Sequence, residues 1–371
     1  MRGMGIHDQL GARKLVNADA TLTRLGGSLM PQEVIAAMLD AAQYWVDLPD
    51  FQKRIGAKLA EITHNEAAFV STGAAAGIVL STAACVAGTD PALIARLPDT
   101  TGMKNEVIML RSHRNGYDHA VRQVGIKLVE IGNATATYDW ELEKAITDKT
   151  AAIFWFVGWM QRAVDLPFEQ VIEIANRHGV PVIVDAAAQL PPVENLWKFT
   201  NAGATAAIFS GGKDLRGPQT TGLVVGKKAF IDLLPAHASP NNTMGRPMKV
   251  GKEEMAGLLA AVERYIKLDH GLRAEYCEET VADWCGALNT VPGVTAERSF
   301  PNEAMQPLPR CHIQLDPEKF VQADVLKALL NGDPPVVVGA GKNNDLYLNP
   351  MTLEPGEESI VIQQLAKVLR K

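Results

Sequence analysis

The sequence predicts an α/β protein, with a mainly parallel sheet in a large unit and a smaller α+β unit after it. Short apolar runs alternate with amphipathic helical segments from about residue 67 to residue 225, a pattern typical of a parallel sheet covered by helices on both faces. Near residue 250 this alternation ends, and long helical stretches precede a half-exposed strand at Cys311–Leu315. The chain has 371 residues, which suggests two or three packed units.

Two helical periodicities come before the first predicted strand. Pro31 opens one of them, in which apolar residues recur from Val34 to Trp45, and the other covers about Phe51–Thr63. The strands predicted for the large unit are apolar runs at Ala67–Val70, Val107–Leu110, Lys127–Ile131, Ala151–Val157, Pro181–Asp185, Ala206–Phe209 and Gly222–Val225. The helices predicted between them are Ala74–Val86, His119–Gly125, Asp139–Ile146, with Asp139 as its cap, and Phe168–His178.

The smaller unit has its own succession of elements. We expect helices at Lys252–His270, Ala274–Leu288, Phe320–Leu330 and Glu357–Leu369, and strands at Cys311–Leu315 and Val336–Val338. The Pro/Asn-rich segment Pro235–Pro247 marks the boundary and is long enough to be a functional loop. We therefore predict an N-terminal segment at 1–48 that packs with the small domain, a large domain at 49–250 and a small domain at 251–371.

Composition argues against several classes of protein. The formal charge is −6 and no run of lysine or arginine resembles a phosphate-backbone footprint, so nucleic acid is not expected as the main partner. No apolar run reaches the roughly 18 residues that a membrane span needs, and residues 1–10 lack the apolar core of a signal peptide. The four cysteines lack Cys-x-x-Cys spacing, which favours free thiols in a reducing compartment, and no ligand cluster points to a metal. We expect a cytoplasmic protein.

The most informative residue is Lys213. The strand Ala206–Phe209 ends in Ser210-Gly211-Gly212-Lys213, which places an amine at the C-terminal edge of the sheet, where open α/β folds carry their chemistry. A lysine that is partly desolvated there can have its pKa lowered enough to condense with an aldehyde. We therefore interpret Lys213 as the Schiff-base residue for pyridoxal phosphate, with the Ser210 hydroxyl donating to the cofactor phosphate. The alternative is a solvated surface lysine.

A second candidate cofactor-binding segment is the turn Ser71-Thr72-Gly73-Ala74, between a predicted strand and a predicted helix. Free N–H groups at a helix N-terminus bind anions, and the small side chains of Thr72, Gly73 and Ala74 let a phosphate approach the backbone. The alternative is a plain helix cap. On this motif alone the plain cap would be preferred, so the phosphate site depends on its agreement with Lys213.

Two further candidate residues follow predicted strands. Asp185 ends a buried strand, where a carboxylate needs a cationic or hydrogen-bonding partner, and the pyridinium nitrogen of the cofactor is such a partner. His113 follows the strand Val107–Leu110, where its flat ring could stack on the pyridine face. The alternatives are a helix cap for Asp185 and an exposed loop residue for His113. Gln189 could touch the cofactor 3-oxygen, or could be an ordinary polar residue at the start of a helix.

With these residues assembled, the chain resembles the selenocysteine synthase-like branch of the fold-type-I pyridoxal phosphate enzymes. The specific motif is Gly212–Gln219 around Lys213, with Gly222 after it. Weaker likeness extends over Leu22–Gly27, Asn65–Val70, the Ser112-His113 loop, the Asp185 region and Gly245–Lys252. The turn before Ala74 and the run from Asp185 to Pro192 are similar to a metabolic subgroup, the D-glucosaminate-6-phosphate ammonia-lyases.

The resemblance implies a fold and a chemistry. The fold is the aspartate aminotransferase-like one, with a seven-stranded, mainly parallel large domain and a smaller α+β domain. The chemistry is α,β-elimination on a hydroxylated amino acid, sugar-derived or phosphorylated in the subgroup, to a 2-keto acid and ammonia. Lys213 is then the general base at Cα. Fold-type-I sites are built across a dimer interface, so the resemblance also implies a homo-oligomer.

The substrate carboxylate needs a cationic clamp, for which the bidentate fork of arginine is suited. The candidates are Arg24, Arg114, Arg246 and Arg310, with Arg246 and Arg24 ranked first from their loops. Each of them is alternatively a surface or structural arginine.

Other reactions on this scaffold stay open: selenium transfer or another β-replacement, aldol-type cleavage and racemisation. A relative that binds tRNA or protein without metabolic activity is the rival of another class. Selenocysteine synthase carries an extra N-terminal tRNA-binding domain, whereas this chain begins almost directly with the pyridoxal-enzyme portion and is acidic. Transfer on a tRNA is therefore not expected. The residues do not name the substrate, its stereochemistry, or the oligomer beyond a dimer.

Overall fold

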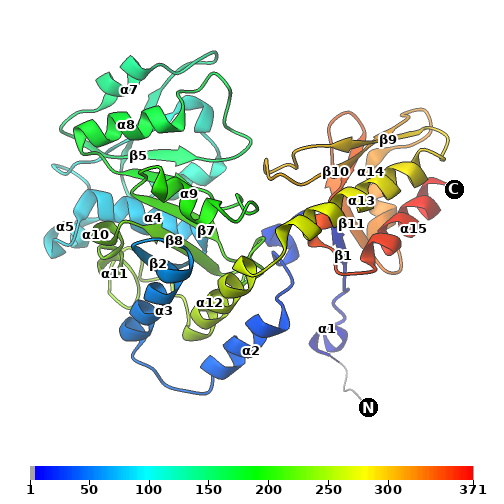
Figure 1. Cartoon of the computed structure of the whole chain (residues 1–371), viewed down its shortest axis with the longest axis horizontal. Helices are drawn as coiled ribbons and strands as arrows, with labels where there is room; N and C mark the ends of the chain where they lie inside the picture. The colour runs from blue at the N-terminus through cyan, green and yellow to red at the C-terminus, as the bar shows by residue number, and fades with distance from the viewer. Residues whose placement is uncertain (1–4, 371) are drawn as a thin grey trace. The chain divides into compact units, whose positions relative to one another are not determined.

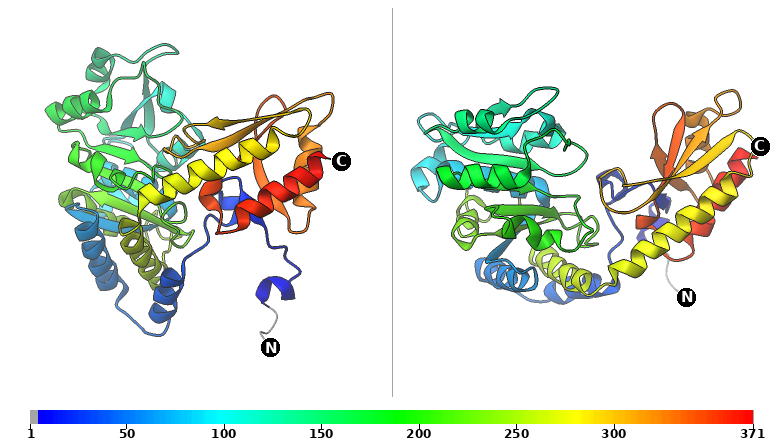
Figure 2. Two further views of the ribbon diagram at one scale, coloured as in Figure 1. Left: turned by 45° about the vertical axis from the view of Figure 1, so that its right-hand side comes forward. Right: turned by 45° about the horizontal axis from the view of Figure 1, so that its top comes forward.

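The computed structural model describes residues 5–370, which form two compact units (Figures 1 and 2). The larger unit spans Met30–Leu268, and the smaller one joins the segment up to Leu29 with the segment from Asp269 onward. The predicted boundaries, after residues 48 and 250, lie elsewhere. The reason is packing: α2 (Gln32–Ala41) and α3 (Leu48–Ile62) both contact α12 (Lys252–Ile266), which draws all three helices into the larger unit.

The larger unit is built on a seven-stranded sheet of order β2-β8-β7-β6-β5-β3-β4. Its strands are β2 (Ala67–Thr72), β3 (Glu106–Leu110), β4 (Lys127–Ile131), β5 (Thr150–Phe156), β6 (Val182–Asp185), β7 (Ala206–Ser210) and β8 (Thr221–Gly226). Strand β8 runs antiparallel to both of its neighbours, and the pairs from β7 to β4 are parallel. The predicted seven-stranded, mainly parallel sheet is thus confirmed.

Helices cover both faces of this sheet, as Figure 2 shows. Apolar residues of α3, α8 (Phe168–His178), α9 (Asn195–Asn201) and α12 fill one core. Those of α4 (Gly73–Ala87), α6 (His119–Arg122) and α10 (Lys228–Ile231) fill the other. Every residue of β5 is buried because both of its faces are covered. The remaining helices are α5 (Pro91–Arg96), α7 (Asp139–Ala145) and α11 (Leu234–His237), with short 3-10 turns at Arg111–His113 and Gly116–Asp118.

The smaller unit holds a five-stranded sheet of order β1-β11-β12-β10-β9. Its strands are β1 (Val16–Ala18), β9 (Val294–Ser299), β10 (Arg310–Leu315), β11 (Val336–Ala340) and β12 (Asp345–Leu348). Its helices are α1 (Ile6–Gln9), α13 (His270–Leu288), α14 (Gln322–Leu330) and α15 (Glu357–Leu369), with 3-10 turns at Thr23–Leu25 and Pro350–Thr352. Residues of α13, α14, α15 and the sheet share one apolar core.

Two local expectations differ from the structure. The break between the helices predicted at Lys252–His270 and Ala274–Leu288 comes earlier: α12 ends at Ile266, and the side chain of Asp269 accepts a hydrogen bond from the N–H of Leu272 (3.0 Å) to start α13. Asp139, expected as a cap, is instead the first residue of α7, and Glu141 accepts from the N–H of Tyr138 (2.9 Å). Among the described residues, no helix is long and apolar enough to cross a membrane.

Candidate active site

The parallel strands bring the predicted residues to one edge of the sheet. Asp185 is the last residue of β6, and its register partners are Phe156 on β5 and Ile208 on β7. His113 ends the short turn that follows β3, which pairs with the other side of β5. Because the carboxyl ends of parallel strands meet at the same edge, these residues and the loop after β7 face one region, as expected for an open α/β sheet.

Asp185 is a buried carboxylate with a cation nearby. Its Oδ1 accepts a hydrogen bond from the N–H of Ala187 (3.0 Å), whose carbonyl in turn accepts from the N–H of Ser210 (3.3 Å). Burial raises the pKa of Asp185, and the Ala187 N–H and the charge of Lys213 oppose that rise. The Lys213 amine therefore lies within electrostatic reach of this carboxylate. A helix cap is not its role, because the next helix, α9, begins only at Asn195.

The loop that carries Lys213 is tightly folded between β7 and β8. The N–H of Arg216 donates to the Lys213 carbonyl (2.9 Å), and the N–H of Gly217 donates to the Gly211 carbonyl (2.8 Å). A Cβ on Gly212 would lie 2.4 Å from the Cα of Gln219, so only glycine allows the two arms of the loop to meet. These contacts fix the backbone on both sides of Lys213.

A buried hydrogen bond holds the same loop against α12. The hydroxyl of Tyr265 donates to Oδ2 of Asp214 (2.7 Å), and both residues are buried. Leu215, next along the loop, is completely buried as well. Tyr265 was not predicted as a site residue. The sequence pattern that could have marked Tyr265 as buried is the helical spacing that places it with Leu258 and Val262 on one face of α12.

The N-terminus of α4 is open and has an unsatisfied hydroxyl beside it. Thr72 precedes Gly73, the first residue of the 15-residue helix, and its buried Oγ1 has no hydrogen-bond partner. A Cβ on Gly73 would meet no atom within 4 Å, whereas one on Gly222 would lie 2.4 Å from the Gly73 carbonyl carbon. Gly222 thus lets β8 approach the turn, and the free N–H groups of Gly73, Ala74 and their neighbours are left for an anion.

His113 is fully buried, so it is not an exposed loop residue. Its Nδ1 accepts from the N–H of Phe156 (3.4 Å), and its Nε2 lies 3.6 Å from Oδ2 of Asp165. Burial lowers the pKa of His113 to about 4, with Asp165 opposing. The ring is therefore neutral at pH 7, and the accepting Nδ1 places the proton on Nε2. The ring also meets Trp155 edge-on, with centroids 4.5 Å apart.

Asp165, which the sequence did not single out, orders the surroundings of His113. Ser112 donates its hydroxyl to Oδ1 of Asp165 (2.7 Å), and the N–H of Arg162 donates to Oδ2 (2.8 Å). Asp165 lies in an irregular loop between β5 and α8, where no periodicity could have marked it. Gln189, in the loop after β6, is buried. Its side-chain Nε2 lies 3.5 Å from the carbonyl of Val157, and its backbone carbonyl accepts a hydrogen bond from the side chain of Asn195 (2.6 Å).

Two of the four candidate arginines lie in the larger unit. Arg114 is committed to carboxylates: its Nε donates to Asp118 (2.6 Å) and its Nη1 to Glu130. Arg246 lies in the loop after α11, with Nη1 3.4 Å from the hydroxyl of Ser239. His237 anchors this loop to the far end of α4, because its buried Nε2 lies 2.7 Å from the carbonyl of Gly88.

Arg24 and Arg310 belong to the smaller unit and share a cluster of charges. Arg24 pairs with Asp19 (2.8 Å), and Arg310 pairs with Glu303 (3.2 Å). The Arg310 guanidinium stacks 4.2 Å above the ring of Tyr347, and its buried Nε has no hydrogen-bond partner. Burial raises the pKa of Asp19, with Arg24 and Arg310 opposing, and it also raises the pKa of Glu303. Arg310 is the more enclosed of the two, with 15% of its side chain exposed against 62% for Arg24.

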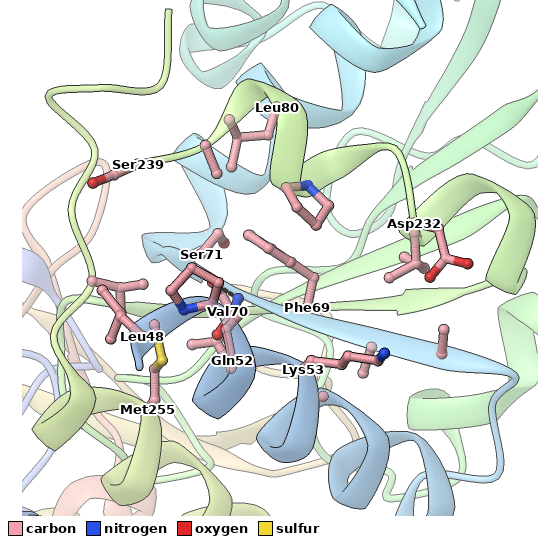
Figure 3. Close-up of a pocket in the computed structure, with 18 of the residues that line it drawn as sticks. Leu48, Gln52, Lys53, Phe69, Val70, Ser71, Leu80, Asp232, Ser239 and Met255 are labelled. Carbon is pink, nitrogen blue, oxygen red and sulfur yellow. Dashed lines mark hydrogen bonds between the residues drawn. The ribbon is translucent and has the colours of Figure 1, made fainter. Parts of the chain in front are cut away.

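A cavity of about 760 Å³ lies elsewhere in the larger unit (Figure 3). Side chains from α3, β2, α10 and the 235–241 loop line it, among them Leu48, Gln52, Phe69 and Ser239. Neither Lys213 nor Asp185 is part of its lining. This cavity, which we call the β2 groove, follows the edge strand of the sheet, and it reaches the Arg246 loop at Ser239 and the residue before Thr72 at Ser71.

The residues at the strand ends fit a phosphorylated pyridine. The orphaned Thr72 hydroxyl and the open turn at Gly73 suit a phosphate, and the buried Asp185 carboxylate suits a protonated ring nitrogen. Lys213 supplies the amine that such a cofactor needs for covalent attachment. The arrangement can therefore bind the group at both ends and present one base to a substrate.

The chain is similar to known proteins over most of its length. A model of the SelA family, described as L-seryl-tRNA selenium transferase, matches residues 15–275. The 5'-C-glycyluridine monooxygenase-decarboxylase of Streptomyces sp. is 33% identical, over 98% of this chain and 92% of that protein. The D-glucosaminate-6-phosphate ammonia lyase of Salmonella typhimurium is 30% identical, over 98% of this chain and 97% of that protein.

Solved structures extend the likeness to three dimensions. A structure of D-glucosaminate-6-phosphate ammonia-lyase superposes with a TM-score of 0.86 at 29% identity, covering 99% of both chains. A more distant structure, serine palmitoyltransferase with pyridoxal phosphate, has a TM-score of 0.61 at 13% identity over 97% of this chain and 88% of that one, which shows the fold alone. The fold is that of the fold-type-I pyridoxal phosphate enzymes. The chain belongs to the SelA family.

Proposed function

We propose that the chain is a pyridoxal phosphate-dependent lyase that eliminates water from a hydroxylated amino acid and releases a 2-keto acid and ammonia. The observation that carries this proposal is the buried Asp185 carboxylate within electrostatic reach of Lys213, at the same sheet edge as the N-terminus of α4. The name of the ammonia lyase relative supports a substrate of the amino sugar acid class, with or without a phosphate. The bound cofactor would supply an electron sink for charge that develops at the substrate Cα.

The chain's own residues would perform three tasks. Thr72, Gly73 and Ser210 hold the phosphate, while Asp185 keeps a proton on the ring nitrogen. Lys213 removes the proton from Cα, because an amine in a partly desolvated site can be uncharged near neutral pH. His113 is the candidate for stacking on the ring; because its side chain is fully buried in this structure, that contact requires the loop around it to open when the cofactor binds. Gln189 is the candidate contact to the 3-oxygen. One of the candidate arginines would bind the substrate carboxylate, with Arg246 and Arg24 ranked first and Arg114 and Arg310 after them.

Absorbance and peptide mapping test the cofactor and its anchor. The purified protein should absorb as a pyridoxal enzyme, and borohydride should fix the cofactor on Lys213. Lys213→Ala should abolish the covalent attachment, and Asp185→Asn should lower the rate of ammonia release by about a hundredfold or more, as expected for loss of a preorganised charge. Asp139→Asn, an exposed helix-start residue, is the matched control. A protein that ignores added pyridoxal phosphate would overturn the proposal.

The reaction is tested with a panel of hydroxylated and sugar-derived amino acids. Equal yields of ammonia and 2-keto acid without oxygen would support elimination. The similarity to the monooxygenase-decarboxylase favours one second candidate, oxygen-dependent decarboxylation. In that case consumption of oxygen and release of carbon dioxide would replace the keto acid and ammonia. Racemisation, aldol cleavage or β-replacement would each give neither pair of products.

We also propose a homo-oligomer in which a second copy fills the β2 groove. The segment Tyr44-Trp45-Val46 ends two residues before Leu48, a groove-lining residue, and Trp45 is completely exposed. Because an exposed side chain and a groove lie next to each other on the same chain, two copies can pair about a two-fold axis. Each copy would then place its Trp45 in the β2 groove of the other. Lys53 and Lys228 line the groove together with Glu66 and Asp232, and Lys228 pairs with Asp232 (2.7 Å), so the proposed fit rests on the exposed apolar Trp45 and not on charge.

Light scattering on the purified protein tests the oligomer. Trp45→Ser should convert the assembly to a smaller species, whereas Trp140→Ser, at a second exposed tryptophan on α7, should leave the mass unchanged. Equal masses for the wild type and Trp45→Ser would reject the groove as the interface. The cytoplasm stays the proposed location, and it is compatible with four cysteines that form no disulfide bond among the described residues.

A further inference from the structure

The smaller unit places two thiols in contact. Cys285 on α13 and Cys311 on β10 have their Sγ atoms 3.5 Å apart. A disulfide bond requires about 2.05 Å, so closure needs an approach of roughly 1.5 Å. The two residues are 26 positions apart in sequence and belong to different elements, so their contact is a product of the fold.

Both thiols are held in place by the core around them. Val281, Trp284 and Leu288 recur with Cys285 at helical spacing, so Cys285 lies on the buried stripe of α13. Cys311 alternates with Ile313 and Leu315 on the buried face of β10, and it is completely buried. Trp284 also ties α13 to α15 by donating its Nε1–H to the carbonyl of Glu358 (3.1 Å). Neither sulfur can move far from the other while this core is intact.

The two sulfurs differ in a way that orders the chemistry. Cys285 is half-buried, so a small oxidant can reach it, whereas Cys311 lies behind it. The pKa of Cys285 is lowered, chiefly because the Cys311 thiol hydrogen-bonds to it, with burial and Glu297 opposing. The hydrogen bond with Cys285 and burial both raise the pKa of Cys311. The thiolate, which is the reactive form, is thus favoured on the accessible member of the pair.

We propose that Cys285 and Cys311 form a reversible disulfide when the protein meets a hydroperoxide. The Cys285 thiolate attacks a peroxide oxygen, the O–O bond breaks, and a sulfenic acid and hydroxide result. The Cys311 sulfur then attacks the Cys285 sulfur, the S–S bond forms, and the S–OH oxygen leaves with the Cys311 proton as water. Two thiols lose two electrons in total, and hydrogen peroxide is reduced to two molecules of water. A dithiol reductant reverses the step.

The other two cysteines serve as internal controls. Cys85 lies in the larger unit on α4, where burial raises the pKa of its thiol to about 12. Cys277 lies on α13 in a separate apolar cluster with Leu308 and Met351. Neither is in the apolar core that holds Cys285 and Cys311. Selective loss of two of the four thiols is therefore the expected signature.

The test treats the full chain with hydrogen peroxide, blocks remaining thiols under acid quench, and measures the intact mass and the peptide map. We expect two blocked thiols in place of four, a mass lower by two hydrogens before blocking, and a peptide pair joining Cys285 to Cys311. Dithiothreitol should restore all four. Cys285→Ser should prevent the link, and the paired variant Cys85→Ser, Cys277→Ser should retain it.

Three results would overturn the proposal. One is four blockable thiols after oxidation, and another is a peptide link to Cys85 or Cys277. The third is over-oxidation of Cys285 to a sulfinic acid with Cys311 still reduced. The wild-type peptide map decides the matter even where a serine variant folds poorly. The readout requires neither the cofactor nor a substrate, so it stands apart from the proposed lyase activity.

Discussion

At the scale of single residues, His113 shows how burial sets a charge state. The ring is enclosed by Trp155, Phe156 and Asp165, and its nearest carboxylate, at 3.6 Å, is too distant to offset desolvation fully. Its pKa is accordingly lowered to about 4. A neutral imidazole with a defined tautomer is a stable surface against which an aromatic ring can pack.

This lowered pKa predicts how stability depends on pH. In the unfolded chain His113 binds a proton near pH 6.5, whereas in the folded chain it does so only near pH 4. The unfolded state therefore binds more protons between these values, and stability falls as the pH is lowered through this window. The full effect is about 3 kcal/mol. Urea unfolding at pH 7 and pH 5 measures the part of the effect that is lost between these values, about 2 kcal/mol.

The matched variant for this prediction is His113→Gln, which cannot titrate. Its free energy of unfolding should fall less than that of the wild type between the two pH values. His237, whose pKa is also lowered by burial, contributes equally to both proteins and cancels in the comparison. Identical pH profiles for the two proteins would contradict the assignment.

Tyr265 and Asp214 show what the sequence could not reveal at this scale. Lys213 and Asp185 follow apolar strands, so their positions at the sheet edge could be predicted from the run that precedes each. The partner of Asp214 comes from α12, 51 residues further on, and only the fold brings it there. Asp165 is likewise distant in sequence from His113 and lies in an irregular loop.

The Tyr265–Asp214 bond predicts the effect of removing one hydroxyl. Tyr265→Phe leaves a buried carboxylate without this donor, which should lower the free energy of unfolding by about 1–3 kcal/mol. Tyr276→Phe is the control, because that hydroxyl meets the exposed side of Glu358 at 3.1 Å and should cost little. Chemical denaturation measures both. Equal, small losses would mean that the bond does not support the Lys213 loop.

At the scale of elements, predictability followed the amount of apolar surface in each segment. Fully buried strands such as β5 and β6 were predicted from continuous apolar runs. Strands β1, β9 and β12 were missed: β1 has three residues, and β9 alternates buried and exposed positions with charged side chains. The break between α12 and α13 was predicted, but a few residues too late in the chain, because the helical pattern continues on both sides of Asp269.

The approach of β8 to the start of α4 yields a prediction at this scale. Gly222→Ala would place a methyl group 2.4 Å from backbone atoms of Gly73, and backbone cannot rotate away as a side chain can. We expect a loss of about 1–3 kcal/mol in stability and a weaker affinity for pyridoxal phosphate, because the anion-binding turn is displaced.

The control for Gly222 is another glycine with free space around it. A Cβ on Gly286, within α13, would meet no atom within 4 Å. Gly286→Ala should therefore be neutral or stabilise the protein by up to about 1 kcal/mol. Thermal unfolding and cofactor titration compare the two variants. An unchanged cofactor affinity in Gly222→Ala would show that the turn tolerates the methyl group.

At the scale of the whole molecule, the chain consists of two units with separate apolar cores. The fold class and the presence of a second α+β unit could be predicted, because the alternation of elements changes near residue 250. Which segments of the chain belong to each unit could not be predicted, because the N-terminal strand β1 pairs with β11, more than 300 residues away. No local pattern encodes such a pairing.

Separate cores predict separable unfolding. Leu346→Ala removes a completely buried side chain from the smaller unit and should cost about 2–5 kcal/mol there. Leu142→Ala does the same in the larger unit. In calorimetry each variant should lower one of two transitions and leave the other in place. A single transition that both variants lower equally would show that the units unfold together.

The antiparallel strand β8 has a consequence for the order in which the site is assembled. Because β7 and β8 are adjacent and antiparallel, Lys213 lies in the connection of a hairpin, whereas Asp185 reaches the same edge through crossovers between parallel strands. Hairpins close over short stretches of chain and form within about 1–10 μs, while parallel pairings must first close long loops. The β7–β8 connection that carries Lys213 is therefore the part of the site that can fold first. Asp185 joins it when the parallel strands pair.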